Sequence, residues 1–130
     1  MPTEYKGRSI GIIVLTGAQV LIGVIHLFIG LVLVAVVLTG SSVTLAYSIY
    51  TVAFGALALV FAAFIWQGKK EGWVGTVAVS VFVIAADTLT VLKLPSEPGI
   101  PTFAAPTEIV YSLFLFVYLL LPHVRKKFSI

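Results

Sequence analysis

The sequence contains no cysteine. This absence excludes disulfide bonds, thiol catalysis, CxxC redox chemistry and iron–sulfur clusters. Charged residues are also scarce, at 10% of 130 residues, whereas soluble domains carry roughly a quarter. No catalytic or nucleotide-binding motif is present, and a net charge of +3 is weak support for nucleic-acid binding. The composition therefore argues against a soluble enzyme, and we expect no nucleic-acid partner and no cofactor.

What the chain has instead is long apolar runs. Hydrophobic residues make up 60% of it, and its mean hydropathy is +1.15. A membrane-crossing helix needs about 20 mainly apolar residues, and four segments qualify, at about 9–38, 44–66, 73–92 and 105–121. We predict one all-α domain over residues 1–130, a multi-pass four-transmembrane-helix bundle of up-down topology in the cell membrane. Membrane lipid is its first expected partner.

Polar, glycine-containing or proline-containing stretches separate these runs. Thr39–Ser42 predicts a short turn, and Gln67–Gly72 interrupts the second run. The segment Lys93–Pro101 contains three prolines, which remove backbone donors and clash with the preceding helical turn. Pro122 marks the end of the fourth run.

The basic residues predict the orientation of the bundle. Seven of the eight fall on one side of the predicted spans, namely Lys6, Arg8, Lys69, Lys70, Arg125, Lys126 and Lys127. Cytoplasmic loops are enriched in Lys and Arg, so we expect both termini in the cytoplasm. Trp66 and Trp73 flank the basic hairpin, where indole rings favour the headgroup level. We interpret the basic stretch 123–127 as a solvated topology signal.

A stripe of small and polar residues runs along the first span. Thr16, Gln19, Gly23, His26 and Gly30 are spaced three or four apart, so they share one helix face. Small residues let two helix backbones approach closely, and Gln or His can hydrogen-bond across the contact. We therefore expect this face to point into the bundle, with Gly23 and Gly30 as helix-packing positions.

The third span carries a matching stripe that contains Ser80 and Asp87. A charge near hydrocarbon is costly and usually faces a partner or water. Counting about 1.5 Å per residue along each helix places four side chains at similar depths. The predicted polar cluster consists of His26, Asp87, Glu108 and Tyr50, with Gln19 and Ser80 on the same stripes.

Three interpretations of this cluster remain open. It is a hydrogen-bonded network that fixes helix register, a proton relay or ligand site, or a metal site. One imidazole and two carboxylates suit iron, zinc or copper, but no HxxxH or ExxH spacing supports a metal, and we predict none. Glu108 also has an alternative, because a first-turn carboxylate complements a helix N-terminus and can face water.

Two stretches give the chain a resemblance to a known group of proteins. The hairpin Phe64-Ile-Trp-Gln-Gly-Lys-Lys-Glu-Gly-Trp73 and the ending Tyr118-Leu-Leu-Leu-Pro-His-Val-Arg-Lys-Lys-Phe128 resemble parts of small four-helix prokaryotic integral membrane proteins of unknown function. The resemblance implies a bundle with a basic turn between its second and third helices. The group has no established catalytic residues, so the resemblance assigns none here.

From the sequence we expect a non-catalytic integral membrane subunit or scaffold that packs against helices of other membrane subunits, in a respiratory or oxidative complex. The alternative is a small proton-coupled transporter that uses Asp87 and His26. A transporter should have a water-accessible cavity at Asp87, whereas a scaffold should have Asp87 closed off by its partners. We also expect a direct hydrogen bond between His26 and Asp87, because the two lie at similar depths.

Overall fold

The computed structural model describes residues 9–40, 45–92 and 105–130. About 90% of these residues are helical, and none of them lies in a strand. The helices are α1 (Ile10–Val37), α2 (Leu45–Trp66), α3 (Lys70–Val91), α4 (Ala105–Leu120), α5 (Pro122–Arg125) and the 3₁₀ helix η2 (Lys126–Phe128). The proline-rich segment 93–101, the residues Lys6 and Arg8, and part of the predicted turn at 39–42 lie outside the described residues.

Three of the described helices, α1, α2 and α3, are long and apolar enough to cross a membrane. α4 passes the same test only together with α5 and η2, from which it is bent by 73°. The bend falls at Leu121, which has extended backbone angles, and Pro122 then opens α5. The described part of the chain therefore has three candidate spans, or four if the bent pair counts as one.

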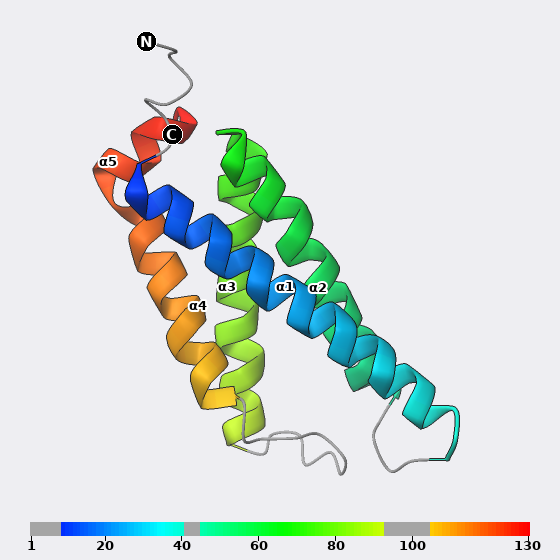
Figure 1. Cartoon of the computed structure of the whole chain (residues 1–130). Helices are drawn as coiled ribbons and strands as arrows, with labels where there is room; N and C mark the ends of the chain where they lie inside the picture. Colours follow the sequence, from blue (N-terminus) through cyan, green and yellow to red (C-terminus); the bar gives the residue numbers. More distant parts are fainter. Residues whose placement is uncertain (1–8, 41–44, 93–104) are drawn as a thin grey trace.

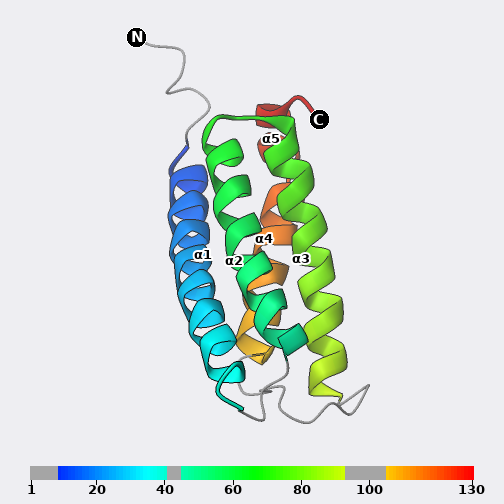
Figure 2. The same cartoon turned by 90° about the vertical axis from the view of Figure 1, so that its right-hand side faces the viewer.

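The helices α1 to α4 lie side by side, as Figures 1 and 2 show. We call one end of the molecule the terminal end. It contains the start of α1, the end of α2, the start of α3, and the helices α5 and η2. α1 ends and α4 begins at the opposite end, which we call the loop end. The most extensive helix contacts are between α1 and α2 and between α3 and α4. The molecule thus consists of two close helix pairs joined through α2 and α3.

Glycines bring α1 and α2 into close contact. A Cβ atom on Gly55 of α2 would lie 2.5 Å from the Leu27 backbone nitrogen and 2.8 Å from the Gly23 carbonyl oxygen of α1. At Gly30, a Cβ would lie 2.7 Å from the Val52 backbone nitrogen. Real Cβ atoms essentially never come this close to backbone, so the packing of α1 on α2 requires glycine at these positions.

Replacement of Gly55 by alanine should therefore force α1 and α2 apart. We expect the free energy of unfolding to fall by about 1–3 kcal/mol, the usual cost of an overpacked contact. Gly17→Ala on α1 is the matched control, because nothing lies within 4 Å of a Cβ built there. Denaturation in detergent micelles, followed by circular dichroism, measures both variants. Equal stability of the two variants would contradict this packing.

A tight turn connects α2 to α3. The Gly68 N–H donates to the Ile65 carbonyl at 3.0 Å, and the Lys69 N–H donates to the Phe64 carbonyl at 2.9 Å. Gly68 has a φ of 72°, so the pattern is a Schellman motif with glycine in the left-handed position. The motif satisfies carbonyls at the end of α2. α3 then begins at Lys70, three residues before the predicted start of the span at Trp73.

The largest apolar core of the described residues lies at the terminal end. It contains Ile12, Leu15, Ile65, Leu115, Leu119, Val124 and Phe128. Val124 and Phe128 belong to α5 and η2, and their exposed fractions are 0% and 2%. The interpretation of 123–127 as a solvated signal was therefore incomplete, because apolar side chains four residues apart anchor this basic segment to the bundle.

Candidate functional site

The interior changes character toward the loop end, where polar side chains replace the apolar core. Each of α1, α2 and α3 contributes a buried row spaced mostly three or four residues apart. On α1 the row includes Thr16, Gln19, Gly23 and Gly30, and on α3 it includes Thr76, Ser80 and Asp87. The predicted stripes of the first and third spans thus lie on the packed faces of α1 and α3.

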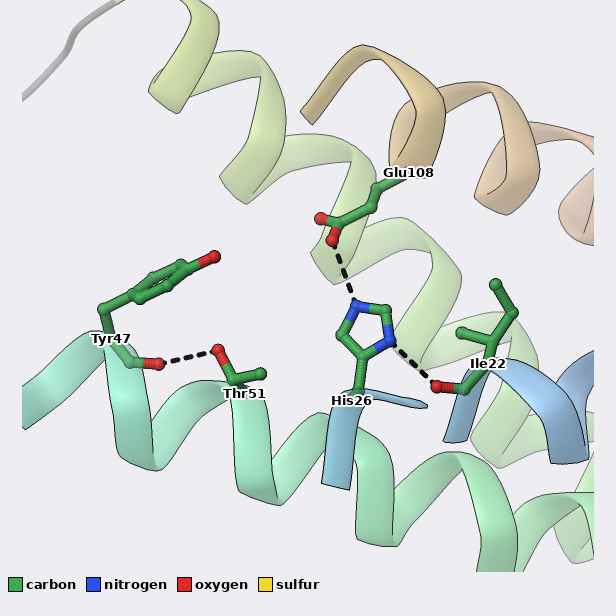
Figure 3. A network of polar contacts seen from close by, with 5 residues as sticks. All are labelled: Ile22, His26, Tyr47, Thr51 and Glu108. Atoms are coloured by element: carbon green, nitrogen blue, oxygen red, sulfur yellow. Dashed lines mark hydrogen bonds and ion pairs between the residues drawn. The ribbon is translucent and has the colours of Figure 1, made fainter. Parts of the chain in front are cut away.

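His26 joins α1 to α4 (Figure 3). Its Nδ1 atom lies 2.9 Å from the Ile22 carbonyl oxygen, one turn earlier on α1. Its Nε2 atom lies 3.0 Å from Oε1 of Glu108 in the first turn of α4. The side chains of His26 and Glu108 are 18% and 26% exposed. Glu108 therefore faces the interior, although part of its carboxyl side chain remains accessible.

These contacts fix how the pair holds protons. A carbonyl oxygen only accepts hydrogen bonds, so Nδ1 of His26 carries a hydrogen and donates it to Ile22. The bond between Nε2 and Glu108 then needs one proton, either on the ring or on the carboxyl group. Both arrangements have zero net charge. The pair can therefore move this proton between its two atoms without leaving an isolated charge in an apolar environment.

Asp87 extends this pair to α3. Its carboxyl group interacts electrostatically with the Glu108 carboxyl group, and Asp87 is 7% exposed. Two ionised carboxylates are acceptors only, so a hydrogen bond between them requires a second proton. Oδ2 of Asp87 is buried and has no hydrogen-bond partner among the described residues. We call His26, Glu108 and Asp87 the polar triad.

The predicted hydrogen bond between His26 and Asp87 is wrong, because His26 bonds to Glu108 instead. Both ring nitrogens of His26 are engaged, by Ile22 and by Glu108. Glu108 bonds to His26 and interacts electrostatically with Asp87. Depth along the helices places all three side chains in one layer, but it does not give their order around the bundle axis.

α2 closes the triad with aromatic side chains. Tyr50, which the sequence places in the cluster, interacts electrostatically with Asp87 and Glu108. Figure 3 shows the Tyr47 side chain reaching from α2 toward Glu108, with which it also interacts. The Phe54 ring packs edge-on against the His26 ring, at 4.7 Å between centroids. The triad thus lies in a largely aromatic surrounding that limits its contact with the bilayer.

Gln19 and Ser80 lie closer to the terminal end than the triad. Gln19 precedes His26 by seven residues, about 10 Å along the helix. Its Nε2 donates to Oγ1 of Thr76 at 3.1 Å, which links α1 to α3. Both residues line a small internal cavity that also includes Ser80, Tyr111 and Ser112. The predicted cluster therefore divides into two levels, the triad and this cavity.

α2 carries a buried row of small and polar residues that was not predicted from the sequence. Ser48 and Thr51 are buried, with exposed fractions of 0% and 4%, and Thr51 Oγ1 donates to the Tyr47 carbonyl at 2.9 Å. The signal was present in the sequence. Ser48, Thr51, Gly55, Ala58 and Ala62 are small residues at steps of three and four, the same rule that identifies the stripe on the first span.

Trp73 has a role beyond anchoring at a headgroup. Its indole Nε1 donates to the Leu119 carbonyl at 2.7 Å and so joins α3 to the last turn of α4. Trp73→Phe removes this donor while keeping an aromatic ring. We expect the free energy of unfolding to fall by about 1 kcal/mol, the usual net value of one hydrogen bond. Denaturant titration in detergent measures the change, and an unchanged midpoint would contradict a structural role for this bond.

Neither a metal-binding group nor a related protein identifies the site. Within residues 9–40, 45–92 and 105–130, no group of three or more His, Cys, Asp or Glu side chains is arranged to hold a metal ion. Comparison of the chain with protein families, curated proteins and solved structures finds no match. The role of the triad therefore has to be argued from its own chemistry.

Proposed function

We propose that the chain is a four-span, up-down bundle of the cell membrane with both termini in the cytoplasm, and that it acts as a small proton-coupled carrier. His26, Glu108 and Asp87 bind and pass the proton. The observation that supports this most is the hydrogen bond between His26 of α1 and Glu108 of α4, with the buried Asp87 of α3 in electrostatic interaction with Glu108. Intramembrane ionisable residues mark proton relays and ion pathways by default.

The alternative that the triad is a structural lock is less well supported. A lock that fixes helix register gains most when every buried polar atom has a partner. Asp87 leaves a buried carboxyl oxygen unpartnered among the described residues, which stabilises nothing. Within the described residues, no cavity is lined by Asp87, contrary to the expectation for a transporter. The carrier proposal therefore requires Asp87 to exchange its proton through Glu108 and His26, which are more exposed.

Proton uptake by proteoliposomes tests the proposal. Purified protein is placed in vesicles that contain a pH-sensitive dye, and a membrane potential, negative inside, drives protons inward. We expect the rate of internal acidification to fall to that of protein-free vesicles in Asp87→Asn, which keeps the side-chain volume but cannot exchange the proton. Glu71→Gln is the matched control, because Glu71 is an exposed acid in the first turn of α3. Unchanged uptake in Asp87→Asn would remove the proposal.

A second candidate, an accessory membrane subunit or scaffold, is favoured by two observations. Asp87 is closed off by its neighbours, as expected for a scaffold. In addition, α1 exposes a continuous apolar face that includes Val14, Leu21 and Phe28, at 62%, 61% and 68% exposure. These residues share one helix face, which suits contact with a partner helix as well as with lipid.

Isolation in mild detergent from the native membrane tests this candidate. We expect another membrane subunit to copurify at a fixed ratio and to be lost when Leu21 and Phe28 are both replaced by alanine. The matched control replaces Val110 and Phe114 of α4, which are also strongly exposed. A clean monomer or homodimer would count against a subunit role.

A further inference from the structure

The small cavity between the helix pairs lies about one to two helical turns from the triad, toward the terminal end. Its volume is about 20 Å³, measured as the space open to the centre of a water molecule. Its lining is mixed and its accessible surface is mainly apolar. The five polar side chains are Gln19, Thr76, Ser80, Tyr111 and Ser112, and the six apolar ones are Ile22, Phe54, Ala58, Phe61, Val79 and Leu115. A cavity holds a water molecule when this volume exceeds roughly 10–15 Å³ and two to four polar partners are available.

Two atoms of the lining residues have hydrogen-bonding capacity that the described residues do not use. Oε1 of Gln19 and the hydroxyl of Tyr111 are both buried and have no partner among the described residues. Gln19 itself is 4% exposed. An unpartnered buried group is costly, and purely apolar cavities stay dry whereas polar ones hold water.

We infer that this cavity binds one water molecule, which donates to Oε1 of Gln19 and shares a hydrogen bond with the Tyr111 hydroxyl. Ser80 and Ser112 line the same space and offer further hydroxyl oxygens to the water. This inference combines the cavity with the two unpartnered atoms of its lining residues, and it does not depend on the carrier role.

The role of this water rests on the proposed function. Ile22, whose carbonyl accepts from His26, also lines the cavity, and Tyr111 follows Glu108 by three residues and so lies on a nearby face of α4. The water therefore extends the polar path of the triad to Gln19 in the middle of the bundle. Beyond Gln19 lies the apolar core around Ile12 and Leu119, so a carrier must open this core to release the proton at the terminal end.

Two measurements on Tyr111→Phe test the site. In lipid bilayers, solid-state NMR records magnetisation transfer from water to the side-chain amide of Gln19, which we expect to be rapid in the wild type and lost in the variant. Removal of the hydroxyl should also lower the thermal unfolding midpoint, because the water loses a partner. Tyr118→Phe, on the same helix but outside the cavity lining, should change neither reading.

A dry cavity predicts the opposite result. Tyr111→Phe would then remove an unpartnered hydroxyl and raise the midpoint, and the wild type would show no water transfer to Gln19. Either finding overturns the water site.

The Asp87→Asn variant separates this inference from the proposed function. If proton uptake is unchanged in Asp87→Asn, the carrier proposal fails and the water site is unaffected. If uptake depends on Asp87 but no water signal is seen at Gln19, only the water site fails.

Discussion

Replacing Glu108 by alanine is expected to destabilise the folded bundle by about 2–3 kcal/mol, the upper part of the range for a hydrogen bond to a charged group. Glu108 bonds to His26 and interacts electrostatically with Asp87. Its loss therefore removes the partner of the partly exposed His26 ring and an interaction of the buried Asp87. His26→Leu leaves the interaction of Glu108 with Asp87 in place, and we expect it to cost about 1–2 kcal/mol, as for polar contacts between membrane helices.

A double-mutant cycle in detergent micelles measures the losses in free energy of unfolding for His26→Leu, Glu108→Ala and the double variant. Once Glu108 is alanine, the additional cost of His26→Leu should shrink toward zero, because the partner of the ring is gone. Glu71→Ala serves as the control and should stay within about 0.5 kcal/mol of wild type, as usual for surface changes. Additive effects of His26→Leu and Glu108→Ala would show that the two side chains do not interact.

Asp87→Leu should separate stability from activity. Leucine removes a buried carboxyl group that has an unpartnered oxygen, and such groups cost about 1–3 kcal/mol. We expect the free energy of unfolding to stay the same or rise by about 1 kcal/mol, while proton uptake falls to the rate of protein-free vesicles. Gains of stability at the expense of activity are typical of functional sites.

A structural lock predicts the reverse for the same variant. If Asp87 holds the helices together, Asp87→Leu lowers the free energy of unfolding by an amount comparable to Glu108→Ala. Unfolding in detergent and uptake in vesicles, measured on the same protein preparation, decide between the two roles. A clear loss of stability would assign Asp87 to the packing of α3 on α4.

Much of the helical layout could be predicted from apolar run length and residue spacing. The predicted first span at 9–38 corresponds to α1 at Ile10–Val37, because a long apolar run without proline or charge has few places to stop. The steps of three and four place Thr16 and Gln19 on the buried face of α1, since helix periodicity alone determines which residues share a face.

The identity of contacting side chains was harder to predict. Depth along a helix follows from residue count, but the angular position around the bundle depends on how α1 to α4 pack. The partner of His26 was therefore assigned to Asp87 of α3 instead of Glu108 of α4. The folding of Val124 and Phe128 back onto the core was also missed, because the surrounding basic residues dominate the pattern of that segment.

The exchangeable proton of the triad is tested most directly by ¹⁵N NMR of His26 in lipid bilayers as the pH is varied. The chain has two histidines, so His123→Gln leaves His26 as the only ring observed. We expect Nδ1 to stay protonated against the Ile22 carbonyl while the Nε2 resonance changes with pH, and we expect Asp87→Asn to alter that change. Ring resonances that are independent of pH would contradict proton exchange at this site.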